Sequence, residues 1–233
     1  MAGGADHVLL TRFNLPSKGF EGMITAKEGW LTDRIALFEF YCLPSVRAQT
    51  NQGFHWIIYF DPESPEWLKR RVQNHADEGV YVPIFRPSVS NADLVADIAR
   101  VTGGHGTRLI TTNLDSDDGL AIDFVDRLQA TGPLRDRTAV YLSWGLIKSG
   151  SRLYLRLDRN NAFASVVENW SSPSTCWSNW QLVSDILVAQ PLRLARESGR
   201  ALVKGVVFRL LGKKGLDKVK DIWASRVGRK LPL

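Results

Sequence analysis

The chain has 233 residues, of which 44% are hydrophobic and 23% charged. Its 8 Trp, 10 Phe and 5 Tyr give it enough apolar surface for a core, which excludes disorder throughout, and its two cysteines, Cys42 and Cys176, exclude a disulfide-stapled scaffold. The formal net charge is +6, but residues 193–233 alone carry 12 basic and 3 acidic residues, so residues 1–192 form a mildly acidic body with a net charge of −3.

Strands alternate with helices through the first 130 residues. Alternating and continuous apolar runs predict strands, and apolar positions at three- and four-residue steps predict helices. In chain order we expect strand His7–Phe13, helix Leu31–Gln49 that Pro44 kinks or restarts, strand Phe54–Phe60, helix Glu66–His75, strand Gly79–Phe85, helix Asn91–Val101 with Asn91 as its cap, strand Thr107–Leu114 and helix Gly119–Gln129. Short strand-like runs, Thr138–Leu142 and Leu153–Leu157, follow, and the chain becomes helical from about Trp177.

This alternation predicts an α/β fold whose sheet is mostly parallel and flanked by helices. We expect one such domain over residues 1–192 and a basic, amphipathic helical tail over residues 193–233. Ligands of open α/β sheets bind outside the carboxyl ends of the strands. That rule directs attention to Arg12, Asp61 and Asp115, which follow the first, second and fourth strands.

Three acids stand within four residues after the fourth predicted strand: Asp115, Asp117 and Asp118. Unpaired carboxylates this close repel one another, and a divalent cation removes that cost. In an extended segment Asp115 and Asp117 would face the same way and could share one centre. Hard oxygen ligands suit Mg²⁺ or Mn²⁺. The alternative is that Asp117 or Asp118 only caps a helix that begins at Gly119.

Two further segments resemble nucleotide-sugar glycosyltransferases of the GT-A fold. They are the stretch Leu43–Thr50, followed by the strand that ends in Asp61, and the cluster Leu114–Asp118 with the helix after it, which resembles the Asp-x-Asp element of that superfamily. More closely, residues 7–170 resemble a bacterial family of rhamnosyl transferases. The matching segments are His7–Asn14, Trp30–Arg34, Leu43–Thr50, Ile110–Asp118 and Phe163–Glu168.

The resemblance implies roles for individual residues. Asp115 and Asp117 would hold a metal, Mg²⁺ or Mn²⁺, on the diphosphate of the donor, with Asp118 beside them. Asp61 would lie near the nucleobase or ribose of the donor. Further residues expected near the nucleotide are Thr11, Arg12 and Arg34. Arginine suits this place because its guanidinium binds phosphate oxygens in pairs, although a surface ion pair is an equally good explanation of either arginine.

The general base is the least determined group. Inverting sugar transfer needs a carboxylate that takes the proton of the acceptor hydroxyl. The second half of the chain offers Glu168 and Asp185, and Glu168 precedes a predicted loop where it would be displayed. Three tryptophans could stack on an acceptor sugar or belong to the core: Trp170, Trp177 and Trp180. Many GT-A enzymes add a late His to the metal, but all four histidines here precede the acidic cluster.

The tail carries two apolar stripes, one of them with Trp223, among clustered Lys and Arg. This is the pattern of an interfacial helix on an anionic membrane, and equally of a helix that packs on the domain with its charges in water. Neither a secretory signal nor an apolar run of about 18 residues is visible, so we expect a cytoplasmic protein that can reach the inner face of the plasma membrane through the tail.

The sequence therefore favours a metal-dependent glycosyltransferase. It would move a sugar, with rhamnose or another deoxyhexose as candidates, from a nucleotide-sugar donor to a bacterial surface glycan or lipid-linked acceptor. The alternative is an inactive GT-A-fold module that binds a nucleotide or glycan. The acidic body and the lack of a nucleic-acid-binding fingerprint argue against nucleic acid as a partner.

Overall fold

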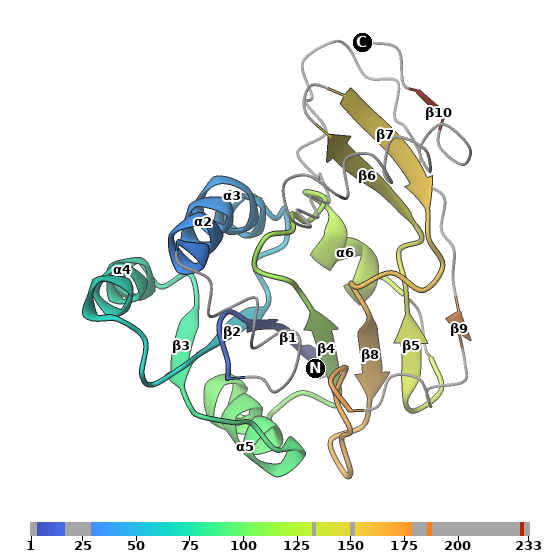
Figure 1. Ribbon diagram of the computed structural model, residues 1–233. Coiled ribbons are helices and arrows are strands. Elements are labelled where there is room, and N and C mark those ends of the chain that lie inside the picture. Colours follow the sequence, from blue (N-terminus) through green and yellow to red (C-terminus); the bar gives the residue numbers. More distant parts are fainter. Residues whose placement is uncertain are drawn as a thin grey trace.

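We describe a computed structural model of the chain that covers residues 4–16, 29–131, 134–149 and 152–178, with the strands Ile186–Leu187 and Arg229–Lys230. Its strands form a central seven-stranded sheet in the order β3-β2-β1-β4-β8-β5-β9 (Figure 1). The strands are β1 (Ala5–Arg12), β2 (His55–Phe60), β3 (Val82–Phe85), β4 (Arg108–Asn113), β5 (Thr138–Val140), β8 (Ser165–Glu168) and β9 (Ile186–Leu187). All neighbours pair in parallel except β8, which is antiparallel to both β4 and β5.

Helices cover both faces of this sheet. They are α2 (Trp30–Leu37), the π-helix η1 (Phe38–Cys42), α3 (Leu43–Arg47), α4 (Glu66–Asp77), α5 (Asn91–Thr102) and α6 (Phe124–Gln129). Helix α5 packs on one face with Ile57 and Val166, and the other helices pack on the opposite face with Leu9 and Ile58. Strand β1 is buried on both faces, which explains why its sequence is a continuous apolar run. The predicted α/β fold with a mostly parallel sheet is confirmed.

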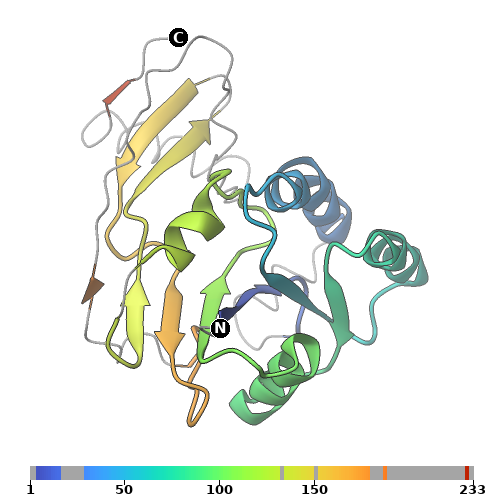
Figure 2. The ribbon, with the colours of Figure 1, turned by 180° about the vertical axis from the view of Figure 1, so that it is seen from behind.

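A second, smaller sheet stands beside the first (Figure 2). It consists of the antiparallel strands β6 (Trp144–Ser149), β7 (Arg152–Leu157) and β10 (Arg229–Lys230), in the order β10-β7-β6. Strand β6 was not predicted from the sequence. The residues that form β9 and β10 were predicted to be helical, and for these four residues the prediction is wrong. The rest of the predicted helical tail lies outside the described residues.

The helical segment expected to kink or restart at Pro44 changes its bonding pattern there, and α3 begins with the proline in its first turn. Residues 30–47 pass through the π-helical turn η1 immediately before the proline, and the Leu43 amide donates to the Phe38 carbonyl, five residues back. In a regular α-helix the proline ring would clash with the carbonyl of Phe40. The wider π-turn replaces the regular α-helical bonding just before the proline, so the helical segment continues through Pro44.

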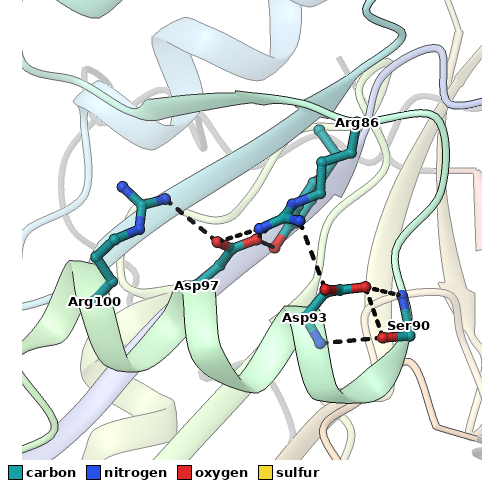
Figure 3. Close-up of polar contacts among 6 residues, drawn as sticks. Arg86, Ser90, Asp93, Asp97 and Arg100 are labelled. Atoms are coloured by element: carbon teal, nitrogen blue, oxygen red, sulfur yellow. Dashed lines mark hydrogen bonds and ion pairs between the residues drawn. The ribbon is translucent and has the colours of Figure 1, made fainter.

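Helix α5 is fastened at its start and along its buried side (Figure 3). Ser90, rather than the predicted Asn91, is its cap: the Ser90 hydroxyl accepts from the Asp93 amide at 3.1 Å, and the Asp93 carboxylate accepts from the Ser90 amide. Asp97, buried on the same helix, accepts from Tyr59 at 3.1 Å and from both Arg86 nitrogens at 2.8 and 3.1 Å. A buried carboxylate needs such partners, and these tie α5 to the ends of β2 and β3.

The predicted helix Gly119–Gln129 begins only at Phe124, because residues 119–123 form hydrogen bonds with another part of the chain, as described below. Within the described part of the chain, none of the helices combines the length and the apolar character that crossing a bilayer requires.

Candidate functional site

The order of the central sheet reverses between β1 and β4. The chain builds β2 and β3 outward on one side of β1, and then returns to add β4 on its other side. The carboxyl ends of β1 and β4 therefore flank the point where open α/β sheets bind ligands. Strand β1 ends at Arg12 and β4 ends at Asn113, with the three acids directly after it.

The acids lie on a tight turn. The Asp118 amide donates to the Asp115 carbonyl at 3.1 Å, so the extended arrangement expected for Asp115 and Asp117 is wrong. Asp115 is half-buried, whereas Asp117 and Asp118 are buried. The Asp117 carboxylate lies 2.9 Å from the Arg34 guanidinium, which in turn stacks over Trp30 at 5.1 Å. Neither Asp117 nor Asp118 caps a helix, because α6 begins later, at Phe124.

The negative charge of the turn reaches its surroundings. Burial raises the pKa of the Cys42 thiol well above its usual value, and the charges of Asp118, Asp117 and Asp115 raise it further, while Arg34 opposes them. A site with this excess of negative potential favours a cation.

The described part of the chain does not supply a full set of metal ligands. Among residues 4–16, 29–131, 134–149 and 152–178, no three His, Cys, Asp or Glu side chains are arranged to hold a metal ion. Mg²⁺ commonly binds through one or two carboxylates and takes its other ligands from water and substrate phosphates. The acidic turn offers two carboxylates of this kind, those of Asp115 and Asp117.

The stretch Leu43–Thr50, which the sequence singled out only by its resemblance to GT-A glycosyltransferases, forms hydrogen bonds with the segment that follows the acids. Ser45 accepts from the Leu120 amide at 3.0 Å. Gln49 donates to the Ala121 carbonyl at 2.7 Å and accepts from the Val125 amide at 3.1 Å. The Thr50 hydroxyl donates to Asp126. These bonds replace the intrahelical bonds predicted for residues 119–123 and fix the acidic turn against α3.

The other residues expected near the nucleotide are placed differently from one another. Thr11 is fully buried beneath the site and accepts from the Trp56 indole at 2.9 Å. Arg12 is exposed at the end of β1. Asp61 is half-buried after β2, where its carboxylate accepts from the Glu63 amide at 2.8 Å. Arg12, Asp61 and the acids thus share the carboxyl edge of the sheet, with Thr11 as support below them.

Glu168 lies at the opposite edge. It is 1% exposed and pairs with Leu109, at the amino end of β4, so that about 13 Å of strand separates it from Asn113. Its carboxylate accepts from the Ser174 and Thr175 amides, each at 2.8 Å. The expected display of Glu168 on a loop is therefore wrong, and its carboxylate binds backbone instead. The other candidate base, Asp185, lies outside the described residues.

The tryptophans divide between the two edges. Trp170 donates to Asp6 at 2.8 Å, at the amino end of β1. Trp177 donates to Asn113 at 2.8 Å, at the carboxyl end of β4, where it also carries Arg12 on its ring. Trp180 lies outside the described residues. The spacing of Trp170 and Trp177 in the sequence does not predict that they lie at opposite edges of the sheet, because it does not reveal the path of the chain after β8.

The comparison with known proteins agrees with this architecture. The family model described as "Putative rhamnosyl transferase" matches residues 6–186, which span the whole central sheet and the acidic turn. No curated protein matches the chain. The mostly parallel sheet flanked by helices agrees with a GT-A-like fold. By its sequence over these residues, the chain belongs to the family that this family model describes.

Proposed function

We propose that the protein is a metal-dependent glycosyltransferase that moves a sugar from a nucleotide-sugar donor to a glycan or lipid-linked acceptor. The observation that carries the proposal is the acidic turn after β4, which lies at the reversal of strand order, with Arg34 paired to Asp117 at 2.9 Å. Family membership supports sugar transfer in general. Rhamnose or another deoxyhexose is the proposed sugar.

In this proposal Asp115 and Asp117 hold Mg²⁺ or Mn²⁺, and Asp118 supports the turn from within. The ion, when bound, supplies positive charge to the leaving diphosphate. Arg34 keeps the Asp117 carboxylate oriented through their ion pair, while Arg12 offers its guanidinium from the far side of the β1–β4 junction. Asp61 binds the nucleoside part of the donor from the end of β2.

Sugar transfer also requires a base for the acceptor hydroxyl. Glu168 is no longer a candidate because it is buried at the amino edge. The other acid proposed from the sequence, Asp185, lies outside the described residues, and its role as the base stays a prediction.

The experiment compares Asp117→Asn with Asp123→Asn. Asp123 is an acid six residues further on that pairs with Arg127 at 2.6 Å, away from the turn. Thermal shifts with nucleoside diphosphates and nucleotide sugars, with and without Mn²⁺, measure binding, and release of nucleoside diphosphate measures turnover. We expect Asp117→Asn to lose the Mn²⁺-dependent thermal shift and at least a hundredfold in turnover, with Asp123→Asn like the wild type.

Normal turnover by Asp117→Asn would refute the metal assignment. Metal-dependent donor binding by the wild type without turnover, tested over a range of glycan acceptors, would instead favour the inactive binding module.

We also propose that the basic tail brings the enzyme to an anionic membrane surface, where a lipid-linked acceptor is available. Each basic residue near such a leaflet contributes about 1 kcal/mol, and residues 193–233 carry a net charge of +9. Full-length protein should sediment with phosphatidylserine-containing vesicles and be released by salt, whereas a chain ending at Gly199 should stay in solution. Equal sedimentation of the two chains would refute the proposal.

A further inference from the structure

After β8 the chain turns back and passes beside β4, on the sheet face that α5 covers. We call residues 172–178 the strap. Its Cys176 amide donates to the Thr111 hydroxyl of β4 at 2.8 Å, and the Cys176 side chain packs in the core on that face. Ser178 donates to Asn91, at the start of α5, at 2.8 Å. The strap therefore runs from the amino edge of the sheet, where it lies beside Glu168, to the carboxyl edge, where it places Trp177.

Glu168 anchors the beginning of the strap. Both of its carboxylate oxygens accept backbone amides, from Ser174 and Thr175, and Arg137 lies 3.8 Å away. Thr175 has a φ of 64°. A β-branched residue rarely adopts this left-handed conformation, so its persistence requires surrounding contacts that hold it. The two bonds to Glu168 are such contacts, and they set the direction in which the strap continues.

The strap ends by placing Trp177 against Arg12. The Arg12 guanidinium carbon lies 4.3 Å from the centre of the Trp177 indole ring. The centres of the Trp177 and Tyr59 rings are 5.5 Å apart. The indole nitrogen donates to Asn113 at 2.8 Å, which fixes the ring between the ends of β1 and β4. The side chain of Arg12 has no hydrogen bond or ion pair to the described part of the chain, whereas the side chains of Arg34 and Arg86 are each paired with a carboxylate.

We infer that Trp177 positions Arg12 as the residue that binds the donor diphosphate, and that Glu168 acts through the strap to hold Trp177 in place. The inference rests on the proposed function, since it assigns the anion to the nucleotide of that site. Trp177 and Glu168 are positioning residues: they act through Arg12.

The physical reason is the conformational freedom of arginine. A free arginine at a strand end loses much side-chain entropy when it binds an anion. Stacking on an aromatic face restricts the guanidinium beforehand and leaves the N–H groups at its edge available for two phosphate oxygens. Preorganisation of this kind increases affinity because less freedom remains to be lost on binding.

The test uses two tryptophans of the same segment. Trp177 and Trp170 are both half-buried, both pack against the core on the α5 face, and both donate an indole hydrogen bond to a side chain. Trp177→Leu and Trp170→Leu therefore remove similar apolar contacts at opposite edges of the sheet. Titration calorimetry with UDP, GDP, ADP, CDP and dTDP in the presence of Mg²⁺ measures nucleotide affinity.

We expect Trp177→Leu to weaken binding of the preferred diphosphate about tenfold, and Trp170→Leu to stay within twofold of the wild type.

A double-mutant cycle with Arg12→Gln supplies a readout that loss of packing alone would not change. If Trp177 acts through Arg12, Trp177→Leu weakens binding little further once Arg12→Gln is present. Glu168→Gln, which keeps only one acceptor oxygen for two amides, should weaken binding as Trp177→Leu does. Trp177→Phe, which keeps an aromatic face for Arg12, should bind nearly as the wild type does, and if Trp177→Leu does not fold, Glu168→Gln tests the strap in its place.

The possible failures are distinguishable. If the wild type binds none of the five diphosphates, the proposed function fails and the inference fails with it. If the wild type binds and Arg12→Gln weakens binding, but Trp177→Leu has no effect or an additive one, the proposed function stands and the inference is refuted.

Discussion

His7 shows how a single buried side chain can link stability to pH. It is 1% exposed in β1, its Nε2 lies 3.1 Å from the Thr112 hydroxyl, and its Nδ1 lies 3.4 Å from the Gln129 amide. Burial lowers the pKa of His7 from 6.5 to about 3, because the imidazolium would lose its hydration. With both ring nitrogens at hydrogen-bonding distance from buried neighbours, neutral His7 is part of the packed interior.

This shift predicts acid sensitivity. Between pH 6.5 and about 3 the unfolded chain binds a proton at His7 that the folded chain does not. The free energy of unfolding therefore falls as pH decreases through that window, and His7 accounts for up to about 1.4 kcal/mol of this fall per pH unit. Above pH 6.5 the stabilising contribution of neutral His7 is fully present. Urea unfolding at pH 7, 6 and 5 measures the slope.

The control is His7→Gln, which removes the titrating group and leaves a side chain that can form hydrogen bonds. It should lose less stability than the wild type between pH 7 and 5, even if it is less stable at pH 7. Equal slopes for the two proteins would contradict the assignment to His7.

At the scale of elements, α3 and the segment after the acidic turn behave as one unit. Gln49 is 4% exposed and makes three hydrogen bonds: to the carbonyls of Ser45 and Ala121, and from the Val125 amide. Removal of a buried partner leaves the opposing backbone groups without theirs, which costs about 1–3 kcal/mol for each group.

Gln49→Ala should therefore lower the free energy of unfolding by about 3 kcal/mol. Gln52→Ala is the matched control, because Gln52 is exposed and bonds only to carbonyls of its own stretch, those of Arg47 and Gln49. It should change stability by less than about 0.5 kcal/mol. Chemical denaturation compares the two, and similar losses would mean that Gln49 does not hold the segment.

For the molecule as a whole, the two edges of the central sheet have different tasks. The carboxyl edge holds the acidic turn and Arg12, whereas the amino edge holds buried polar contacts that join distant parts of the chain. Asp6 is an example, since its carboxylate accepts from the Gly106 amide and the Trp170 indole, each at 2.8 Å.

Asp6→Ala should therefore reduce stability and leave sugar transfer unaffected. The lost bonds to a charged acceptor are worth about 2 kcal/mol, equivalent to a fall of roughly 4–8 °C in Tm for a chain of this size. Below the melting transition, kcat/KM should stay within about twofold of the wild type. A tenfold loss of kcat/KM in folded Asp6→Ala protein would show that Asp6, like the proposed strap from Glu168, links the amino edge to the site.

Local sequence sufficed for strands β1 to β4 and helices α4 and α5, because apolar periodicity and turn residues act within a few positions. It also sufficed to bring Arg12, Asp61 and the acids to one edge, since carboxyl ends of parallel strands meet there. Boundaries depended on distant partners: residues 119–123 are irregular because Ser45 and Gln49 bind their backbone.

The position of Glu168 could be decided only by the tertiary structure. An alternating or continuous apolar run has the same pattern in either chain direction, so it does not reveal whether a strand lies parallel or antiparallel to its neighbour. Because β8 runs antiparallel to β4, Glu168 comes to the amino edge and Trp177, nine residues later, returns to the carboxyl edge. Local pattern thus determined which groups follow the parallel strands, and the direction of β8 determined which later residues meet them.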